Sequence, residues 1–370
     1  MSGCKGRPEW VIPVTPSGEF DVAALQVDDA TRAHIATIPQ GSPEWLQQRY
    51  GRLTSSRWGA IGNSAAEEQL LRDMVWPEDA DLTGFARTFA AYGTAHEPVA
   101  RNVYIHHRAL VAGDGLVGMS YPGLLVDKEH GFLGGSPDFV FAEKRRQDDA
   151  NKAAGGTTSD LRYMIDANDI ARALVTDVDA LPEATSAAVS ASASAHDMVV
   201  ACGEIKCPYT QALYSSSGLH EDTDGLPAMY LAQITAVMGM NGYPFCDTVV
   251  YTPHVTEVRR FYLNQKWYDT VLKPSVVEFY MTQVVPRVNA RLRGVLTRGH
   301  IHVLMHLPRL RDVFGSGWVW PEEDDGDEDT AGDDRHVAYD DDDVGALLVQ
   351  EHTGALHSTR RRIRVMPGNA

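Results

Sequence analysis

The sequence predicts an α/β fold, because apolar stretches of strand length alternate along the chain with stretches of helical length. Residues 198–206 are rich in valine and other apolar side chains and are followed by Pro208, which is typical of a buried strand and its end. A second buried strand is predicted around Asp138, which has apolar neighbours on both sides. Further strands are predicted at 247–251 and 258–263, and helices at 161–174, 229–240 and 267–285, the last interrupted at Pro274.

Length and composition limit the possible classes of protein. A chain of 370 residues with 44% hydrophobic residues can form one large domain with extensions. It has no run of about 18 apolar residues and no apolar stretch at its start, so we expect a soluble, intracellular protein with no membrane partner. The four cysteines include no Cys-x-x-Cys pair, which favours free thiols and argues against an iron–sulfur cluster.

The net charge of −17 comes largely from one acidic stretch near the end of the chain. Residues 321–343 contain 13 acidic residues and one arginine, so this stretch carries −12 and the rest of the chain −5. It has almost no apolar side chains, which predicts disorder. We therefore assign residues 313–370 to an acidic, disordered C-terminal tail.

Asp138 and the sequence Glu204-Ile205-Lys206 are the strongest candidates for a chemical site. Side chains alternate along a strand, so Glu204 and Lys206 point to one face while Ile205 points into the core. Two carboxylates and the Ile205 carbonyl offer the oxygen ligands that Mg²⁺ prefers, and a lysine beside the metal can orient an attacking water. A surface pair of Glu204 and Lys206 is the alternative, but carboxylates on two interior strands need a cation to offset their burial.

Asp138 and Glu204 are separated by 65 residues, far more than a hairpin turn needs. Residues 181–196 are rich in alanine and serine, which is typical of a flexible linker. Because the entropy of loop closure grows slowly with loop length, we interpret residues 143–197 as an insertion. The predicted domains are an N-terminal extension at 1–39 and a catalytic domain at 40–312 that carries this insertion.

Two residues outside these strands have a structural and a functional interpretation. Thr94 to Glu97 has the Thr-x-x-Glu form of a capping box, and the following Pro98 is tolerated in a first helical turn. Glu97 is therefore either a helix cap or a metal ligand. Gln233 lies in an apolar helical stretch, where a lone glutamine is usually a boundary residue.

A hydroxyl cluster, Thr54-Ser55-Ser56, precedes a predicted helix start. Such a start attracts anions, because its free N–H groups and the helix dipole converge there. Arg49 lies just upstream and can add a bidentate contact to a phosphate. An ordinary helix cap with a solvated arginine is the alternative.

Five blocks in a fixed order resemble the YqaJ-type viral recombinase family, the phage lambda exonuclease group of PD-(D/E)XK nucleases, which is also similar to the herpesvirus alkaline nucleases. The blocks lie at 40–56, 92–100, 136–138, 203–208 and 229–233. The resemblance covers about residues 40–285. The family often carries Gln-x-Gln in its last block, whereas this chain has Thr235 at the second position.

The resemblance implies a restriction-endonuclease-like fold, in which a central mixed sheet is flanked by helices. It also implies that Glu97, Asp138 and Glu204 hold Mg²⁺, for which Mn²⁺ can substitute, together with the Ile205 carbonyl. Lys206 then positions the attacking hydroxide.

Three further roles follow from the same resemblance. Gln233 is expected to contact the active site or the substrate, and Arg49 and Ser56 to hold the terminal 5′-phosphate of the strand that is degraded. The expected function is a Mg²⁺-dependent phosphodiesterase, a 5′→3′ exonuclease that acts on double-stranded DNA ends in viral DNA recombination, repair or processing. A single-strand annealing protein and further copies of the chain, as in the trimeric phage relatives, are expected as partners.

Two other functions remain open from the sequence. The same core can serve a structure-selective or nicking endonuclease, since no residue distinguishes the two activities. A catalytically inactive DNA-end-binding protein is the second alternative. The presence of Asp138 with Glu204 and Lys206 argues against the second alternative, because a protein that only binds DNA does not require the lysine.

Overall fold

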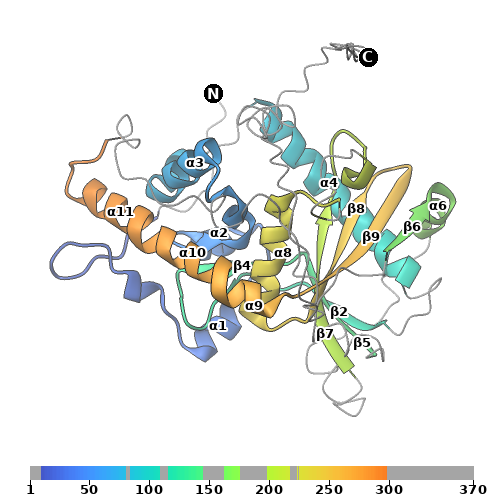
Figure 1. Ribbon diagram of the computed structural model, residues 1–370, viewed down its shortest axis with the longest axis horizontal. Helices are drawn as coiled ribbons and strands as arrows, with labels where there is room; N and C mark the ends of the chain where they lie inside the picture. Colours follow the sequence, from blue (N-terminus) through green and yellow to red (C-terminus); the bar gives the residue numbers. More distant parts are fainter. Residues whose placement is uncertain are drawn as a thin grey trace, which may run out of the picture.

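The computed structural model describes residues 10–80, 84–108, 116–144, 162–175, 198–216, 223 and 225–297. Its centre is a six-stranded sheet in the order β2-β5-β7-β8-β9-β6 (Figure 1). These strands are β2 Leu116–Ser120, β5 Phe139–Lys144, β7 Met198–Lys206, β8 Phe245–Tyr251, β9 Val255–Tyr262 and β6 Arg162–Asp166. The pairing of β7 with β8 is parallel and the other pairings in this sheet are antiparallel, so the sheet is mixed.

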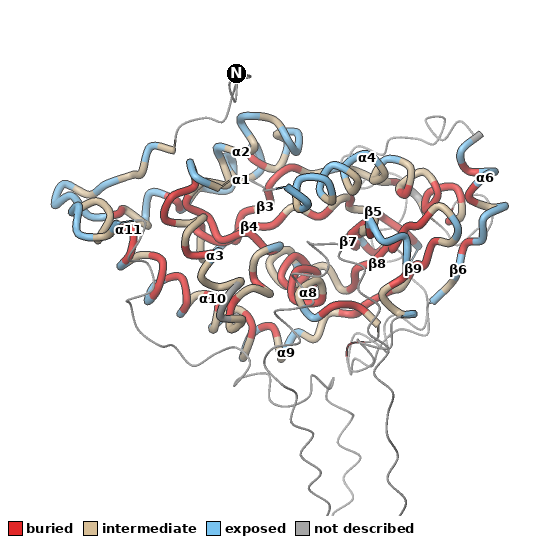
Figure 2. Tube along the Cα trace, turned by 90° about the horizontal axis from the view of Figure 1, so that it is seen from above, coloured by how far each residue is buried: buried red, intermediate tan, exposed pale blue. Residues whose placement is uncertain are grey.

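Helices cover both faces of the central sheet. On one face, Ala100, Val103 and Tyr104 of α4 (Gly84–His106) pack with apolar residues of β5, β7 and β8. On the other face, α8 (Ala228–Asn241) packs against Cys202 and Cys246 of β7 and β8. Figure 2 shows that α8 is largely buried, whereas α4 has many exposed residues in its N-terminal part and is buried toward its C-terminal end. The predicted architecture, a mixed sheet flanked by helices, is confirmed.

A smaller three-stranded sheet lies beside the central one. It is formed by β1 (Leu53–Thr54), β4 (Leu133–Gly135) and β3 (Leu125–Val126). The helices α1 (Asp29–Ile35), α2 (Pro43–Arg49) and α3 (Ser64–Val75) lie in the same part of the molecule (Figure 1). Phe20 and Leu25 pack in one core cluster with Leu53, Trp58 and Tyr280, so part of the predicted N-terminal extension contributes to the core.

The predicted interruption of the C-terminal helix at Pro274 is not observed. The helical path runs through α9 (Gln265–Trp267), α10 (Lys273–Phe279) and α11 (Val285–Leu292). Two π-helical turns, Tyr268–Leu272 and Tyr280–Val284, each end just before a segment that carries a proline in its first turn. Because proline lacks an N–H and crowds the preceding turn, a wider turn lets the helix continue past it.

The predicted helix at 161–174 is wrong in its first half. Residues Arg162–Asp166 form β6, which pairs with β9 at the end of the sheet, and only Ala167–Val175 form a helix, α6. Ile165, Ile170 and Ala173 are buried in the core cluster of α4 and the central strands. This part of the predicted insertion therefore belongs to the core. The linker at 181–196 and the tail at 313–370 lie outside the described residues, and the domain limits stay predictions.

Two predictions from composition concern thiols and membranes. Cys202, Cys207 and Cys246 are free thiols, while Cys4 lies outside the described residues. Among the described helices, none has the length and apolar character needed to span a lipid bilayer.

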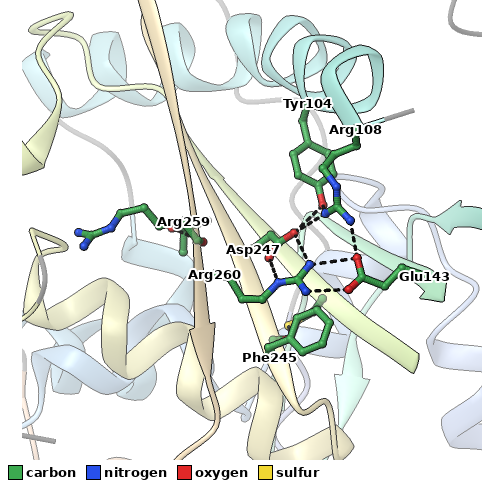
Figure 3. Close-up of polar contacts among 9 residues, drawn as sticks. Tyr104, Arg108, Glu143, Phe245, Asp247, Arg259 and Arg260 are labelled. Carbon is green, nitrogen blue, oxygen red and sulfur yellow. Dashed lines mark hydrogen bonds and ion pairs between the residues drawn. The ribbon is translucent and has the colours of Figure 1, made fainter. Parts of the chain in front are cut away.

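A buried ionic network joins α4 to three strands of the central sheet (Figure 3). Arg260 of β9 contacts Asp247 and Glu143, each at 2.7 Å, and Arg108 contacts the same two carboxylates. The Tyr104 hydroxyl donates to Asp247 at 2.8 Å. The four charged side chains are fully buried. Burial alone would raise the pKa of Asp247, but Arg260 and Arg108 outweigh it and hold that pKa below its usual value.

Asp247→Asn is expected to lower the free energy of unfolding by roughly 3–5 kcal/mol, because it removes one of the two negative charges that offset two buried guanidinium groups. Urea denaturation followed by circular dichroism measures the loss. Asp29→Asn removes a carboxylate from an ion pair whose acid is 81% exposed, and it serves as the control. We expect a change within about 0.5 kcal/mol for the control, and equal losses in the two variants would contradict the role of the network.

The pH dependence of stability gives a second test of the same variant. Since the pKa of Asp247 is depressed in the folded state, its contribution is present above the unfolded pKa, near 3.9, and is lost as the pH falls through the folded pKa. The wild-type chain should therefore lose stability below about pH 4 more steeply than Asp247→Asn.

Candidate active site

The predicted chemical residues meet at one end of two neighbouring strands. Glu204 and Lys206 end β7, and Asp138 lies directly before β5, which runs antiparallel to β7. The Ile205 N–H donates to Asp138 Oδ2 at 2.5 Å, and the Asp138 N–H donates to the Gly203 carbonyl at 3.1 Å. The backbone of β7 therefore holds the Asp138 carboxylate beside Glu204.

Glu204, Lys206 and Gln233 form a compact polar group between β7 and α8. Lys206 Nζ lies 2.7 Å from Glu204 Oε1 and 3.1 Å from Gln233 Oε1. Gln233 Nε2 donates to the same Glu204 oxygen at 2.5 Å. The ring of Tyr230, one turn before Gln233 on α8, lies 4.4 Å from Lys206 Nζ. Ile205 points to the opposite face and is buried among apolar residues, as the strand period predicts.

The carboxylates at this end of the sheet repel one another. Burial, and after it the neighbouring Glu204, raise the pKa of Asp138 well above its usual value, and Glu97 adds to this effect. Burial would lower the pKa of Lys206, but Glu204, Tyr230 and Asp138 outweigh it and hold the pKa above its usual value. Lys206 is therefore a permanent cation beside an excess of carboxylates.

Glu97 is not at a helix start, so the predicted capping box with Thr94 is wrong. The helix α4 begins at Gly84, ten residues before Thr94, and Pro98 lies in its interior. The rings of Phe89 and Tyr92, which precede Thr94 on α4, pack on the ring of Tyr209. Their centroids lie 4.9 and 5.4 Å from the Tyr209 centroid, and these contacts favour a longer helix. Glu97 makes an ion pair of 2.8 Å with Arg101, and its charge acts on Asp138.

The donor set at this end of the sheet fits a hard divalent cation. Glu97, Asp138 and Glu204 supply carboxylate oxygens, although these do not all lie within 4.8 Å of one another. Lys206 contacts Glu204 directly, and Arg101 contacts Glu97. Burial disfavours uncompensated carboxylates, and a bound cation would remove this cost. These oxygens are ligands that Mg²⁺ and Mn²⁺ accept.

A second acidic cluster was not predicted from the sequence. Ligand atoms of Asp127, Glu129 and His130 lie within 4.8 Å of one another, and no other such group occurs among the described residues. Lys273 lies 3.2 Å from Asp127 and 2.8 Å from Glu129, so a lysine already offsets one of the two negative charges of this cluster. Its only sequence signal is the close spacing of the three residues, which is common on protein surfaces.

Arg49 lies close to the segment that carries Asp138. Its guanidinium lies 4.3 Å from the Trp45 ring and donates to Thr54 Oγ1 at 3.2 Å. Trp45 Nε1 in turn donates to Ser136 Oγ at 3.3 Å, two residues before Asp138. Arg49 has no carboxylate partner among the described residues. Burial, and after it the Arg57 cation, lower the pKa of Arg49.

The hydroxyl cluster near Arg49 differs from the predicted helix cap. Residues Ser55–Ala60 form a short 3₁₀ helix, and Thr54 makes no capping hydrogen bond through its side chain. Ser55 is buried next to Gly135, whereas Ser56 is exposed. Gly59 in this segment packs directly on the backbone of Met229, where a Cβ would lie 2.5 Å from the Met229 Cα.

Gly203 controls how closely the two strands of the site approach. A Cβ at this position would lie 1.9 Å from the ring of Phe139, the residue that follows Asp138. Phe139 is fully buried and pairs with Gly203 across the two strands. Glycine at position 203 therefore lets the Phe139 ring lie against the backbone that holds Asp138.

Gly203→Ala is expected to lower the free energy of unfolding by about 1–3 kcal/mol, because the new methyl group overpacks a buried strand pair. Thermal unfolding measures the change. Gly93→Ala is the control, since Gly93 lies in α4 with no atom within 4 Å of the added Cβ. The control should stabilise the chain by up to about 1 kcal/mol through helix propensity, and a stabilising Gly203→Ala would contradict the close packing.

The family of the chain is shown by a domain model. The YqaJ-like viral recombinase domain matches residues 44–244. This chain belongs to the YqaJ-like viral recombinase family. The matched stretch contains every predicted site residue, namely Arg49, Ser56, Glu97, Asp138, Glu204, Ile205, Lys206 and Gln233. The prediction of a nuclease, an enzyme that cleaves phosphodiester bonds, is confirmed with the family.

Two solved structures are similar to the YqaJ-like chain. They are an alkaline exonuclease from Laribacter hongkongensis and the same enzyme in complex with dAMP. Each is 17% identical, covers 69% of this chain and 96% of the other chain, and has a TM-score of 0.41. The sequence has no significant match among curated proteins.

Proposed function

We propose that this chain is a metal-dependent deoxyribonuclease that degrades double-stranded DNA from an end with 5′→3′ polarity, in viral DNA recombination, repair or processing. The observation that carries the proposal is the meeting of Asp138, Glu204 and Lys206 at one end of β5 and β7 in a YqaJ-like chain. A single-strand annealing protein and a homotrimer are the partners that the family resemblance suggests.

In this proposal the carboxylates of Glu97, Asp138 and Glu204, with the Ile205 carbonyl, hold Mg²⁺ or Mn²⁺. A bound metal ion supplies a water of lowered pKa and offsets the charge that develops on the phosphate. The chain itself excludes bulk water from part of the site, since Glu204 is 5% exposed. It also fixes Asp138 through the Ile205 N–H, so the carboxylate needs little reorganisation.

Lys206 acts as a hydrogen-bond donor to the attacking water and the phosphate. Its pKa is raised, so it stays protonated at neutral pH and does not accept a proton. Glu204 and Gln233 each hold the ammonium group, and the Tyr230 ring lies beside it. These contacts fix the position of the ammonium group, which gives it the orientation that electrostatic stabilisation of a transition state requires.

Arg49 and Ser56 bind the terminal 5′-phosphate in this proposal. Supporting it, the Arg49 guanidinium has no carboxylate partner among the described residues and has the Arg57 cation near it. A bound anion would offset both the cost of burying the Arg49 charge and its repulsion by Arg57. Trp45 and Ser136 link the arginine to the segment of Asp138, so a bound strand end would lie near the catalytic carboxylates. The exposed Ser56 hydroxyl is free to add a hydrogen bond to the phosphate.

Lys206→Ala should lower the rate of DNA cleavage by at least about a hundredfold, because it removes a positioned donor to the transition state. Binding of duplex DNA should be nearly unchanged, since the remaining phosphate contacts stay in place. Single-turnover cleavage of labelled linear duplex with Mg²⁺ measures the rate, and fluorescence anisotropy with Ca²⁺ measures binding. Lys266→Ala is the control, because Lys266 is an exposed lysine on α9. A folded Lys206→Ala variant that cleaves at the wild-type rate would exclude the proposed active site.

Linear duplex with a 5′-phosphate should be degraded about ten- to a hundredfold faster than duplex with a 5′-hydroxyl, because the phosphate gains a charge-assisted hydrogen bond. Arg49→Ala should abolish most of this difference. Arg32→Ala, which removes an arginine of an ion pair on α1, should leave it intact. Equal rates on both ends, together with cleavage of closed-circular DNA, would instead support the endonuclease alternative.

A further inference from the structure

We propose that Arg101 and Tyr121 form a clamp that positions Glu97 as a ligand of the metal site. The inference rests on the proposed function, because it assumes that Glu97, Asp138 and Glu204 bind one divalent cation or a pair of them. It gives a role to two residues that lie outside the five sequence blocks of the family resemblance. Arg101 and Tyr121 are positioning residues, since they would act on the metal only through Glu97.

The guanidinium of Arg101 is held between a carboxylate and an aromatic ring. Arg101 Nη2 lies 2.8 Å from Glu97 Oε1, and Arg101 Cζ lies 4.4 Å from the centre of the Tyr121 ring. Arg101 Nε is buried without a hydrogen-bond partner, so the ion pair and the ring are the contacts that hold this guanidinium. The ion pair engages one oxygen of Glu97 and leaves the second oxygen for a cation.

The loop that carries Tyr121 is tied to the segment of Asp138. Gln40 Nε2 donates to the Pro122 carbonyl at 2.8 Å and to the Pro137 carbonyl at 2.9 Å. Pro122 follows Tyr121, and Pro137 precedes Asp138. One amide group therefore connects the platform of the clamp to a second carboxylate of the site. The Tyr121 ring, and with it the position of Arg101, is therefore fixed relative to Asp138 as well as to α4.

Glu97 needs such a clamp because its own helix gives it little support. The next residue, Pro98, has no N–H to bond to the carbonyl of Thr94, so this turn of α4 is weakened. The Glu97 side chain is 36% exposed, and a free glutamate would lose rotamer entropy when it binds a metal. An arginine stacked on a ring reduces that cost, because the planar guanidinium presents Nη2 to Glu97 Oε1 from a fixed direction. A lysine cannot do the same.

The test keeps the charge of the site constant and measures metal binding without catalysis. Arg101→Lys retains the positive charge but loses the planar fork, and Tyr121→Leu removes only the ring. In each variant the affinity of the full chain for Mn²⁺, measured by calorimetry without DNA, should fall by about tenfold or more. Arg72→Lys is the matched control, since Arg72 and Glu68 form an (i, i+4) ion pair of 2.9 Å with similar exposure on α3. The control should bind Mn²⁺ like the wild type.

Two further variants separate this inference from the proposed function. Glu97→Gln and Glu204→Gln should each weaken Mn²⁺ binding if the proposed metal site is correct. If they do, but Arg101→Lys and Tyr121→Leu bind Mn²⁺ as tightly as the wild type or tighter, the clamp is overturned and the metal site stands. If the two glutamine variants bind Mn²⁺ normally, the metal site itself is wrong and the clamp falls with it.

Discussion

The buried network of Arg108, Glu143, Asp247 and Arg260 is the interaction on which the arrangement of the molecule depends (Figure 3). Removing one partner of a buried ion pair leaves an uncompensated charge, which costs several kcal/mol. Glu143, Asp247 and Arg260 come from β5, β8 and β9, and Arg108 lies just after the end of α4, so these segments must pack together for all four charges to be paired. Arg259, the neighbour of Arg260, points to the other side of β9, as strand alternation requires.

This network also constrains the geometry of the candidate active site, because two of its elements carry or directly follow carboxylates of the proposed metal site. β5 follows Asp138, and α4 carries Glu97 seven residues before Tyr104, which donates to Asp247. Seven residues are about two helical turns, so Glu97 and Tyr104 lie on nearly the same side of α4. Fixing Tyr104 against the sheet therefore constrains the rotation of the helix and the direction of Glu97, whose charge acts on Asp138. Arg101 lies between Glu97 and Tyr104 and adds a local constraint.

Several elements were predictable because their signal is local. The apolar stretch ending at Pro208 predicted β7, and the run near Gln233 predicted α8. The errors occurred where distant contacts decide the conformation. Residues 162–166 have apolar spacing that also suits a helix, but they form a strand because β9 offers an unpaired edge. The helix around Thr94 is longer than its capping signal indicates, because aromatic residues of α4 pack on Tyr209.

By itself, the sequence determined that Glu204 and Lys206 share one face of a strand and that the chain is a YqaJ-like nuclease. The first follows from the two-residue period of a strand, and the second from five blocks whose order is visible in the sequence. Only the tertiary structure decided which distant groups contact the carboxylates: Gln233 donates to Glu204, and Arg108 and Arg260 pair with Asp247. Most of these partners come from different elements, and contacts across elements depend on strand order and helix rotation, which no local pattern of side chains encodes.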